Sequence, residues 1–128
     1  MRTLPLILAL LASASAGCGD PASVGAAAGV SDDRSVIQVV SANVQGKNVY
    51  IPSTIVVTAG KDQTLSLFNT TDMPHGFAIA GLGVQAILPP QEELSLALPE
   101  LEGGNVYHVH CHLHPAHRTG TLVVLSAR

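Results

Sequence analysis

The sequence predicts an all-β fold, a Greek-key antiparallel β-sandwich of about eight strands. Short runs rich in Val, Ile, Leu and Thr recur from Ser35 onward, and each is bounded by Gly, Pro, Asn or Asp. Apolar and polar side chains alternate in Leu65-Ser66-Leu67, as a half-buried strand requires. Since no window shows a convincing amphipathic helix, the chain is expected to build its core from sheets alone.

The expected strands follow one another along the chain with short connections. Turns are predicted at 59–62 and 102–105, where Gly residues stand beside Lys, Asp, Glu or Asn. The strands are expected at Val36–Val44, Val49–Thr58, Thr64–Asn69, Gly76–Ala80, Val84–Leu88, Leu94–Leu98, Val106–His112 and Thr121–Ser126.

The N-terminal segment 1–18 has the pattern of a secretory signal. Arg2 supplies a positive charge, Leu4–Leu11 is apolar, and small residues follow. Residues 15–18 resemble the lipobox of bacterial lipoproteins, in which the cysteine, here Cys18, is lipidated after cleavage. Ordinary cleavage after Ala14 or Ala16 is the alternative. We therefore expect an exported protein, either periplasmic or anchored to a membrane through lipid.

The remainder of the 128-residue chain divides into a tether and one domain. Residues 19–34 are rich in Ala, Gly, Ser and Asp without an apolar period, which is typical of a flexible linker. Residues 35–128 are enough for one small β-sandwich. The net charge of −3 and the scattered Lys and Arg residues exclude the basic patch that nucleic-acid binding requires.

Cys111 is the only cysteine of the predicted domain. In an exported protein a lone thiol is exposed to oxidation, unless it is buried and inert or held by a metal ion. Composition does not decide between these two interpretations.

Histidines provide the second part of the pattern. Five of the six lie in the segment 108–117, around Cys111, and the sixth, His75, follows Met73-Pro74. A thiolate combined with imidazoles is a ligand set that favours copper or zinc over hard cations. His114 stands three residues after Cys111, in a loop that Pro115 restricts, so both side chains are expected to reach one metal ion.

Strand alternation separates the histidines into two groups. Cys111 is expected on the apolar face with Tyr107 and Val109. The opposite face is expected to carry His108, His110 and His112, either as a solvated polar surface or as a second metal site.

Two motifs resemble the copper-binding motifs of the cupredoxin family, in particular of amicyanin and plastocyanin-like proteins. They are Asn69-x-x-x-Met73-Pro74-His75 and Cys111-x-x-His114-Pro115. The segments 76–85 and 111–122 also resemble nitrosocyanin, a red copper protein. The resemblance implies one mononuclear copper ion with His75, Cys111 and His114 as equatorial ligands, and a supporting role for Asn69 in the ligand loop.

The resemblance also has two departures. His117 stands where amicyanin-like proteins have an axial methionine, and no Met follows Met73. His75 stands where nitrosocyanin has a glutamate. We therefore expect His117 to be the fourth ligand. Gln85 or a backbone carbonyl is the alternative axial ligand. The simpler interpretation is that His117 is an exposed histidine of the loop and binds no metal.

The expected function is one-electron transfer in the bacterial cell envelope, to a redox partner protein that the sequence does not name. The resemblance places the electron path at the ring edge of His114, surrounded by Leu113, Pro115, Ala116 and Leu82. An electron carrier is favoured over an enzyme, but enzymatic activity stays open.

Three other functions are considered. A nitrosocyanin-like protein would bind or convert a small molecule such as nitric oxide. A multicopper centre is disfavoured because no His-x-His pair lies outside 108–114. Zinc storage or copper delivery would use the same donors, since zinc accepts one cysteine with three histidines.

Overall fold

The computed structural model describes residues 34–128, and every regular element in that range is a strand. No helix of these residues is long and apolar enough to cross a membrane. The strands are β1 (Arg34–Val44), β2 (Lys47–Ile51), β3 (Thr54–Thr58), β4 (Asp62–Asn69), β5 (His75–Ile79), β6 (Val84–Leu88), β7 (Glu93–Ala97), β8 (Val106–His110) and β9 (Gly120–Leu125).

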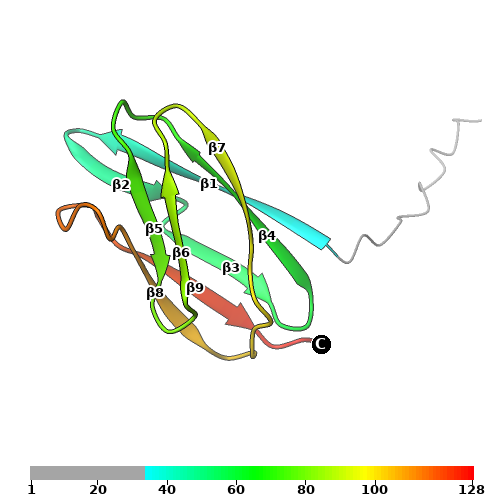
Figure 1. Cartoon of the computed structure of the whole chain (residues 1–128). Coiled ribbons are helices and arrows are strands. Elements are labelled where there is room, and N and C mark those ends of the chain that lie inside the picture. Colours follow the sequence, from blue (N-terminus) through cyan, green and yellow to red (C-terminus); the bar gives the residue numbers. More distant parts are fainter. Residues whose placement is uncertain (1–33) are drawn as a thin grey trace, which may run out of the picture. The chain divides into compact units, whose positions relative to one another are not determined.

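The strands form two sheets that pack into a sandwich (Figure 1). One sheet has the order β2-β1-β4-β7 and the other the order β3-β9-β8-β5-β6. Five of the seven strand pairings are antiparallel, as predicted, whereas β1 pairs with β4 and β3 pairs with β9 in parallel. The all-β sandwich expected from the sequence is therefore confirmed, with two parallel pairings added to it.

The structure has nine strands because the predicted strand Val49–Thr58 is divided in two. Pro52 lies at the break, and its missing N–H cannot contribute to a ladder. Before the break β2 pairs with β1, and after it β3 pairs with β9 in the other sheet. The segment at Pro52 thus carries the chain from one sheet to the other.

The core lies between the two sheets and is filled by alternate residues of the strands. Leu65, Leu67, Phe77, Val109 and Leu122 are fully buried there. Each such side chain contributes about 1.5–3 kcal/mol through removal of apolar surface from water. Cys111 belongs to the same buried cluster, so the core continues up to the candidate site.

The predicted N-terminal segments are not part of this description. The predicted signal at 1–18, with Cys18, and the predicted tether up to residue 33 lie outside the described residues. The first strand begins at Arg34, the last residue of the predicted tether.

Candidate metal centre

His75 and Cys111 meet at one end of the five-stranded sheet. His75 is the first residue of β5, and Cys111 comes directly after β8. The two strands are antiparallel neighbours with Ala78 opposite His110, so the residues that follow His110 run beside the start of β5. Both side chains point inward and are buried, with exposed fractions of 1% for His75 and 5% for Cys111.

His114 completes the group from the loop that follows Cys111. Its Nδ1 lies 3.8 Å from Sγ of Cys111, and its ring centroid is 5.2 Å from that of His75. One potential ligand atom from each of the three residues lies within 4.8 Å of the other two. Three of the four side chains predicted as ligands are therefore gathered around one point.

The sulfur of Cys111 accepts a hydrogen bond from the backbone amide of Gly76, with 3.1 Å between N and Sγ. The carbonyl of the same Gly76 accepts a hydrogen bond of 2.6 Å from the hydroxyl of Tyr50, which is itself buried. Burial raises the pKa of Tyr50, and a thiolate at Cys111 raises it further. Tyr50 therefore stays protonated and keeps its bond to Gly76.

Asn69 holds the loop that leads to His75. Its side chain is fully buried, and its Nδ2 donates to the carbonyls of Met73 at 2.8 Å and of Leu88 at 3.0 Å. Its Oδ1 accepts from the amide and the hydroxyl of Thr71. A single amide thus joins the end of β4, the loop and the end of β6, which fixes the backbone just before His75.

His117 lies next to the group, but its ring nitrogens face other partners. Its Nδ1 lies 2.8 Å from the carbonyl of Arg118, and its Nε2 lies 3.3 Å from the hydroxyl of Ser41. The ring packs on Tyr50 at 4.2 Å between centroids, and 5.1 Å separates it from the ring of His75. The structure therefore brings His117 to the site without turning a nitrogen toward the other three donors, and its role as a ligand stays a prediction.

The surroundings of His75 and His117 lower the pKa of each imidazole and so favour its neutral form. Burial lowers the pKa of His75, and the nearby imidazoles of His117 and His114 lower it further. Burial also lowers the pKa of His117, with a further contribution from His114, whereas the carbonyl of Arg118 acts in the opposite direction. A neutral imidazole is the form that binds a metal ion.

The structure contradicts two predictions made from the sequence, one for Gln85 and one for Leu82. Gln85 is exposed, and it pairs with Ala78, whose side chain lies on the outer face of the sheet. It cannot reach a site on the inner face. Leu82 lies in the turn between β5 and β6, where its amide donates to the carbonyl of Ile79. That turn is at the opposite end of β5 from His75, so Leu82 does not surround His114.

The remaining histidines lie where alternation predicted them. His108 is exposed and His110 and His112 are half-buried, whereas Val109 and Cys111 are buried on the inner face. The three histidine side chains leave the strand on the side opposite that of Cys111, and the surface hollow that they line is also bordered by Cys111 and His117.

Sequence reasoning missed two residues, Tyr50 and Ser41. Both come from the four-stranded sheet and contact the site across the sandwich, through Gly76 and His117. The only signal in the sequence is that Tyr50 is an aromatic residue in a predicted strand. That signal does not show which sheet the strand joins or which residues lie across the core from it.

The donors fit a copper ion. Both ring nitrogens of His75 are buried without a hydrogen-bond partner, although such atoms are normally paired, and the thiol of Cys111 is free. A metal ion would satisfy one of these nitrogens and the sulfur together. One thiolate and two imidazoles in a buried site are the donors of blue-copper electron-transfer centres. Fold and site together thus define a β-sandwich protein with a candidate type 1 copper site.

Comparison with known proteins gives the family. Residues 4–124 match the family model described as "Cupredoxin-like domain", and the chain belongs to this family. No curated protein sequence matches the chain.

Solved structures with the same fold include several copper proteins. A reduced-state variant of amicyanin is 28% identical, with a TM-score of 0.51 over 70% of this chain and 81% of that one. The "Novel Purple Cupredoxin from Nitrosopumilus maritimus" is 20% identical, with a TM-score of 0.51 over 68% and 97%. Auracyanin A, described as a "blue" copper protein from Chloroflexus aurantiacus, is 15% identical, with a TM-score of 0.57 over 71% and 98%. At such identities the last two show a shared fold alone.

Proposed function

We propose that this protein is a one-electron carrier with a single copper ion held by His75, Cys111 and His114. The observation that carries the proposal is the meeting of these three donors within 4.8 Å of one another, in a buried position. When bound, copper supplies reversible one-electron transfer. The family match and the likeness to amicyanin support the choice of this metal.

The surrounding residues keep the donors in place whatever the oxidation state of the metal. Asn69 fixes the backbone before His75, and the amide of Gly76 holds the sulfur of Cys111. Two backbone hydrogen bonds hold the loop that carries His114. The amide of His117 donates to the carbonyl of His114, and the amide of Arg118 donates to the carbonyl of Asn48 in β2. Because these contacts join both sheets, the donors need little rearrangement during electron transfer.

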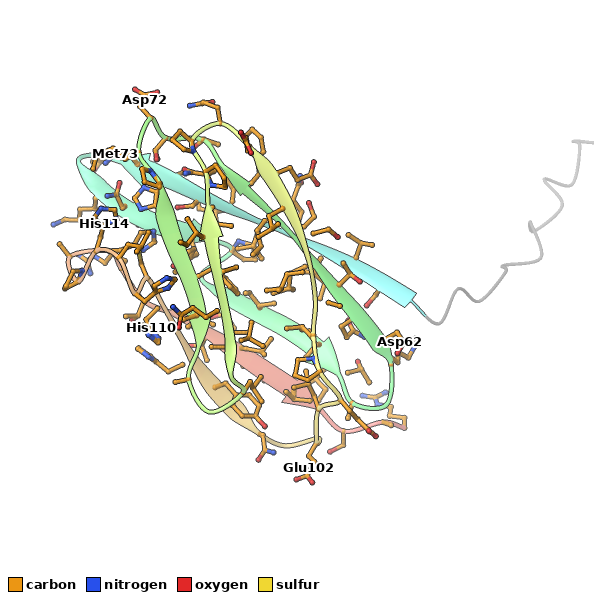
Figure 2. The ribbon with its side chains drawn as sticks, viewed as in Figure 1. Asp62, Asp72, Met73, Glu102, His110 and His114 are labelled. Atoms are coloured by element: carbon orange, nitrogen blue, oxygen red, sulfur yellow. The ribbon has the colours of Figure 1, made fainter. Side chains whose placement is uncertain are left out.

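Electrons would enter and leave at the end of the sandwich that carries His114. Met73 and His114 lie at this end, opposite Glu102 (Figure 2). His114 is partly exposed, whereas His75 and Cys111 are buried, and the apolar side chains of Met73 and Leu113 are 57% and 38% exposed. We infer that a redox partner protein docks here, because exposed apolar side chains next to a buried centre allow close contact without water.

The fourth ligand and the location are part of the proposal. His117 is proposed as the axial ligand, which requires one of its nitrogens to leave the carbonyl of Arg118 or the hydroxyl of Ser41. Export to the bacterial cell envelope, with lipid on Cys18 as the anchor, is inferred from the sequence of residues 1–18. Mass spectrometry of the protein from a membrane fraction tests export and lipidation, because a diacylated N-terminal cysteine has a characteristic mass. A chain that is uncleaved, or that carries no lipid, would contradict the lipid anchor.

A redox titration of the copper-loaded protein tests the electron-carrier function. We expect the visible absorption to disappear on reduction and to return on oxidation, with one electron per chain. Absorption that does not return, or a titration requiring two electrons per chain, would contradict the proposal.

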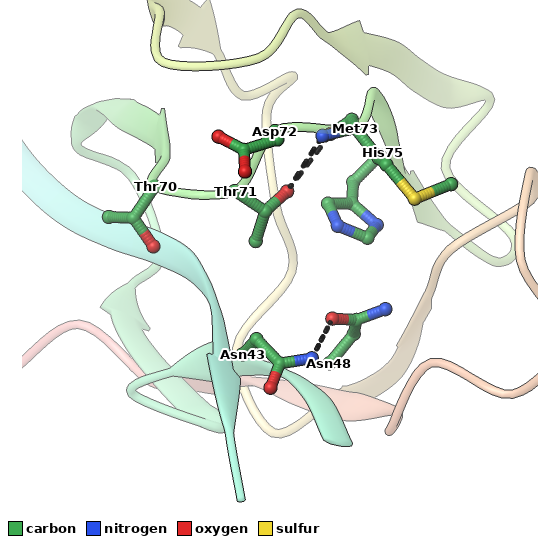
Figure 3. Close-up of a pocket in the computed structure, with 7 residues that line it drawn as sticks. All are labelled: Asn43, Asn48, Thr70, Thr71, Asp72, Met73 and His75. Atoms are coloured by element: carbon green, nitrogen blue, oxygen red, sulfur yellow. Dashed lines mark hydrogen bonds between the residues drawn. The ribbon is translucent and has the colours of Figure 1, made fainter. Parts of the chain in front are cut away.

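A hollow beside His75 supports a second candidate, a protein that binds a small molecule at the metal. Figure 3 shows His75 at this hollow, with Asn43 and Asn48 on one side and Thr71 and Asp72 on another. Its lining is mostly polar, so it suits a small polar ligand better than an apolar one. Nitric oxide added to the copper-loaded protein tests this, since an unchanged spectrum excludes binding at the metal.

A further inference from the structure

His108 and His110 form a pair on the outer face of the five-stranded sheet, away from the candidate copper site. They are two residues apart on β8, so their side chains leave the strand on the same side. Their rings are nearly parallel, with 5.7 Å between centroids and 15° between planes. Neither ring lies in the core, and His108 is exposed.

The neighbouring strand leaves room for these imidazoles. Ala78 of β5 lies opposite His110, and Gly76 lies two residues before Ala78 on the same face. A Cβ at Gly76 would come within 2.5 Å of Nδ1 of His112, so the ring of His112 occupies the space that a side chain would need. Small residues on β5 thus form a cradle for imidazoles from β8 and its continuation.

The cradle contains polar atoms that lack partners. Nδ1 of His110 and Nδ1 of His112 are buried, and neither has a hydrogen-bond partner. The three outer histidines line one hollow of the surface, together with Cys111, Pro115, His117 and Thr119. Buried nitrogens without partners are uncommon, and a cation bound at His110 would satisfy the nitrogen of that residue.

We propose that His108 and His110 form a second metal site, which binds one divalent transition-metal ion such as Zn²⁺. Two imidazoles that share one ion at about 2.1 Å have centroids roughly 5 Å apart, which is close to the observed 5.7 Å, and the two rings must turn out of their nearly parallel arrangement so that one nitrogen of each faces the ion. Imidazole suits Zn²⁺, Cu²⁺ and Ni²⁺, whereas Mg²⁺ and Ca²⁺ require oxygen ligands.

The second site is a two-histidine chelate and not a closed cage. Among residues 34–128, the cluster of three or more metal-binding side chains is that of His75, Cys111 and His114. His112 stays packed on Gly76, and water fills the remaining positions of the ion. Such an open site exchanges its metal easily. Its two proposed ligands are not among the three donors of the inner centre.

Calorimetric titration of the full chain with Zn²⁺ tests the proposal, with His108→Gln as the variant. We expect the parent protein to bind one more Zn²⁺ ion per chain than the variant, or to bind that ion at least about tenfold more tightly. The reason is that the variant keeps a single imidazole at the site, without a second donor on the same strand. The comparison holds whether or not Zn²⁺ also enters the inner site, because His108 contributes nothing there. Equal stoichiometry and affinity in both proteins would overturn the proposal.

Val106→Ala is the matched control. Val106 is 64% exposed and lies two residues before His108, on the same face of β8. Its substitution perturbs the strand to a similar degree but removes no ligand, so Zn²⁺ binding should not change. As a direct readout, Zn²⁺ should shift the imidazole ¹⁵N resonances of His108 and His110, and shifts confined to His75 and His114 would contradict the second site.

Discussion

The amide of Gly76 donates a hydrogen bond to Sγ of Cys111, and it does so from the residue that follows His75. One short segment of β5 therefore supplies both an imidazole and a hydrogen bond to the sulfur. On the outer face, a Cβ at this position would lie 2.9 Å from the backbone nitrogen of His112 and 2.5 Å from its ring. At Gly76, β5 and the cysteine segment thus approach too closely to leave room for a side chain.

Substitution of Gly76 by Ala should consequently damage both stability and the site. Because the added methyl meets backbone atoms, the strands must separate, at a cost of roughly 1–3 kcal/mol. The hydrogen bond to Cys111 lengthens, which changes the electron density on sulfur. Denaturant unfolding and the absorption of the copper-loaded variant measure these effects. Ala at Gly46, which has no atom within 4 Å of the added methyl but a positive φ, should alter stability without altering the spectrum.

Asn69→Ala should destabilise the fold by about 1–3 kcal/mol, because it leaves the buried carbonyl of Leu88 without its side-chain donor. It should also loosen the loop before His75 and weaken copper binding. Chemical denaturation and a copper competition assay measure the two effects. Asn105→Ala is the control, since that side chain is exposed and makes one long hydrogen bond. Equal effects of the two substitutions would contradict the role assigned to Asn69.

The metal-free protein should lose stability as the pH falls below about 6.5. Burial lowers the pKa values of His75 and His117 in the folded state from 6.5, while the unfolded chain keeps the ordinary value. Below that pH the unfolded state binds more protons, so the free energy of unfolding decreases, whereas above it these groups add no dependence. Urea midpoints at pH 7.5 and 5.5 should therefore differ, with the lower midpoint at pH 5.5. A midpoint that is unchanged or higher at pH 5.5 would contradict the lowered pKa values.

His117→Met should make the copper-loaded protein bluer and raise its reduction potential. A histidine nitrogen is a stronger axial donor than a thioether, so the parent protein should be green or red and its potential lower. Absorption spectra and a redox titration of parent and variant provide the measurement. If His117 serves only to join Ser41 to Arg118, His117→Ala will reduce stability and leave the spectrum unchanged, and axial ligation will be wrong.

The parts of the fold that depend on local pattern could be predicted from the sequence. Strand alternation placed Cys111 on the inner face and His108 and His110 on the outer face, because the side-chain period of a strand is fixed by its geometry. The pairing of two motifs indicated that His75 and Cys111 would meet. The split at Pro52 was missed because a continuous run of β-forming residues conceals a change of sheet.

Contacts between the sheets could not be predicted in this way. Tyr50 and Ser41 reach the site from the opposite layer, and nothing in the local sequence shows which residue lies across the core. The same limit explains Gln85, which was considered as a ligand although the register with Ala78 turns it outward. The direction of the His117 nitrogens likewise depends on partners that are distant in sequence.

The bond between copper and the sulfur of Cys111 is the basis of the proposed function, and absorption spectroscopy of parent and Cys111→Ser proteins after copper loading tests it most directly. We predict an intense visible charge-transfer band in the parent protein and its complete loss in the variant. An identical visible spectrum in the two proteins, or a colourless parent protein that has bound one copper ion per chain, would contradict the account.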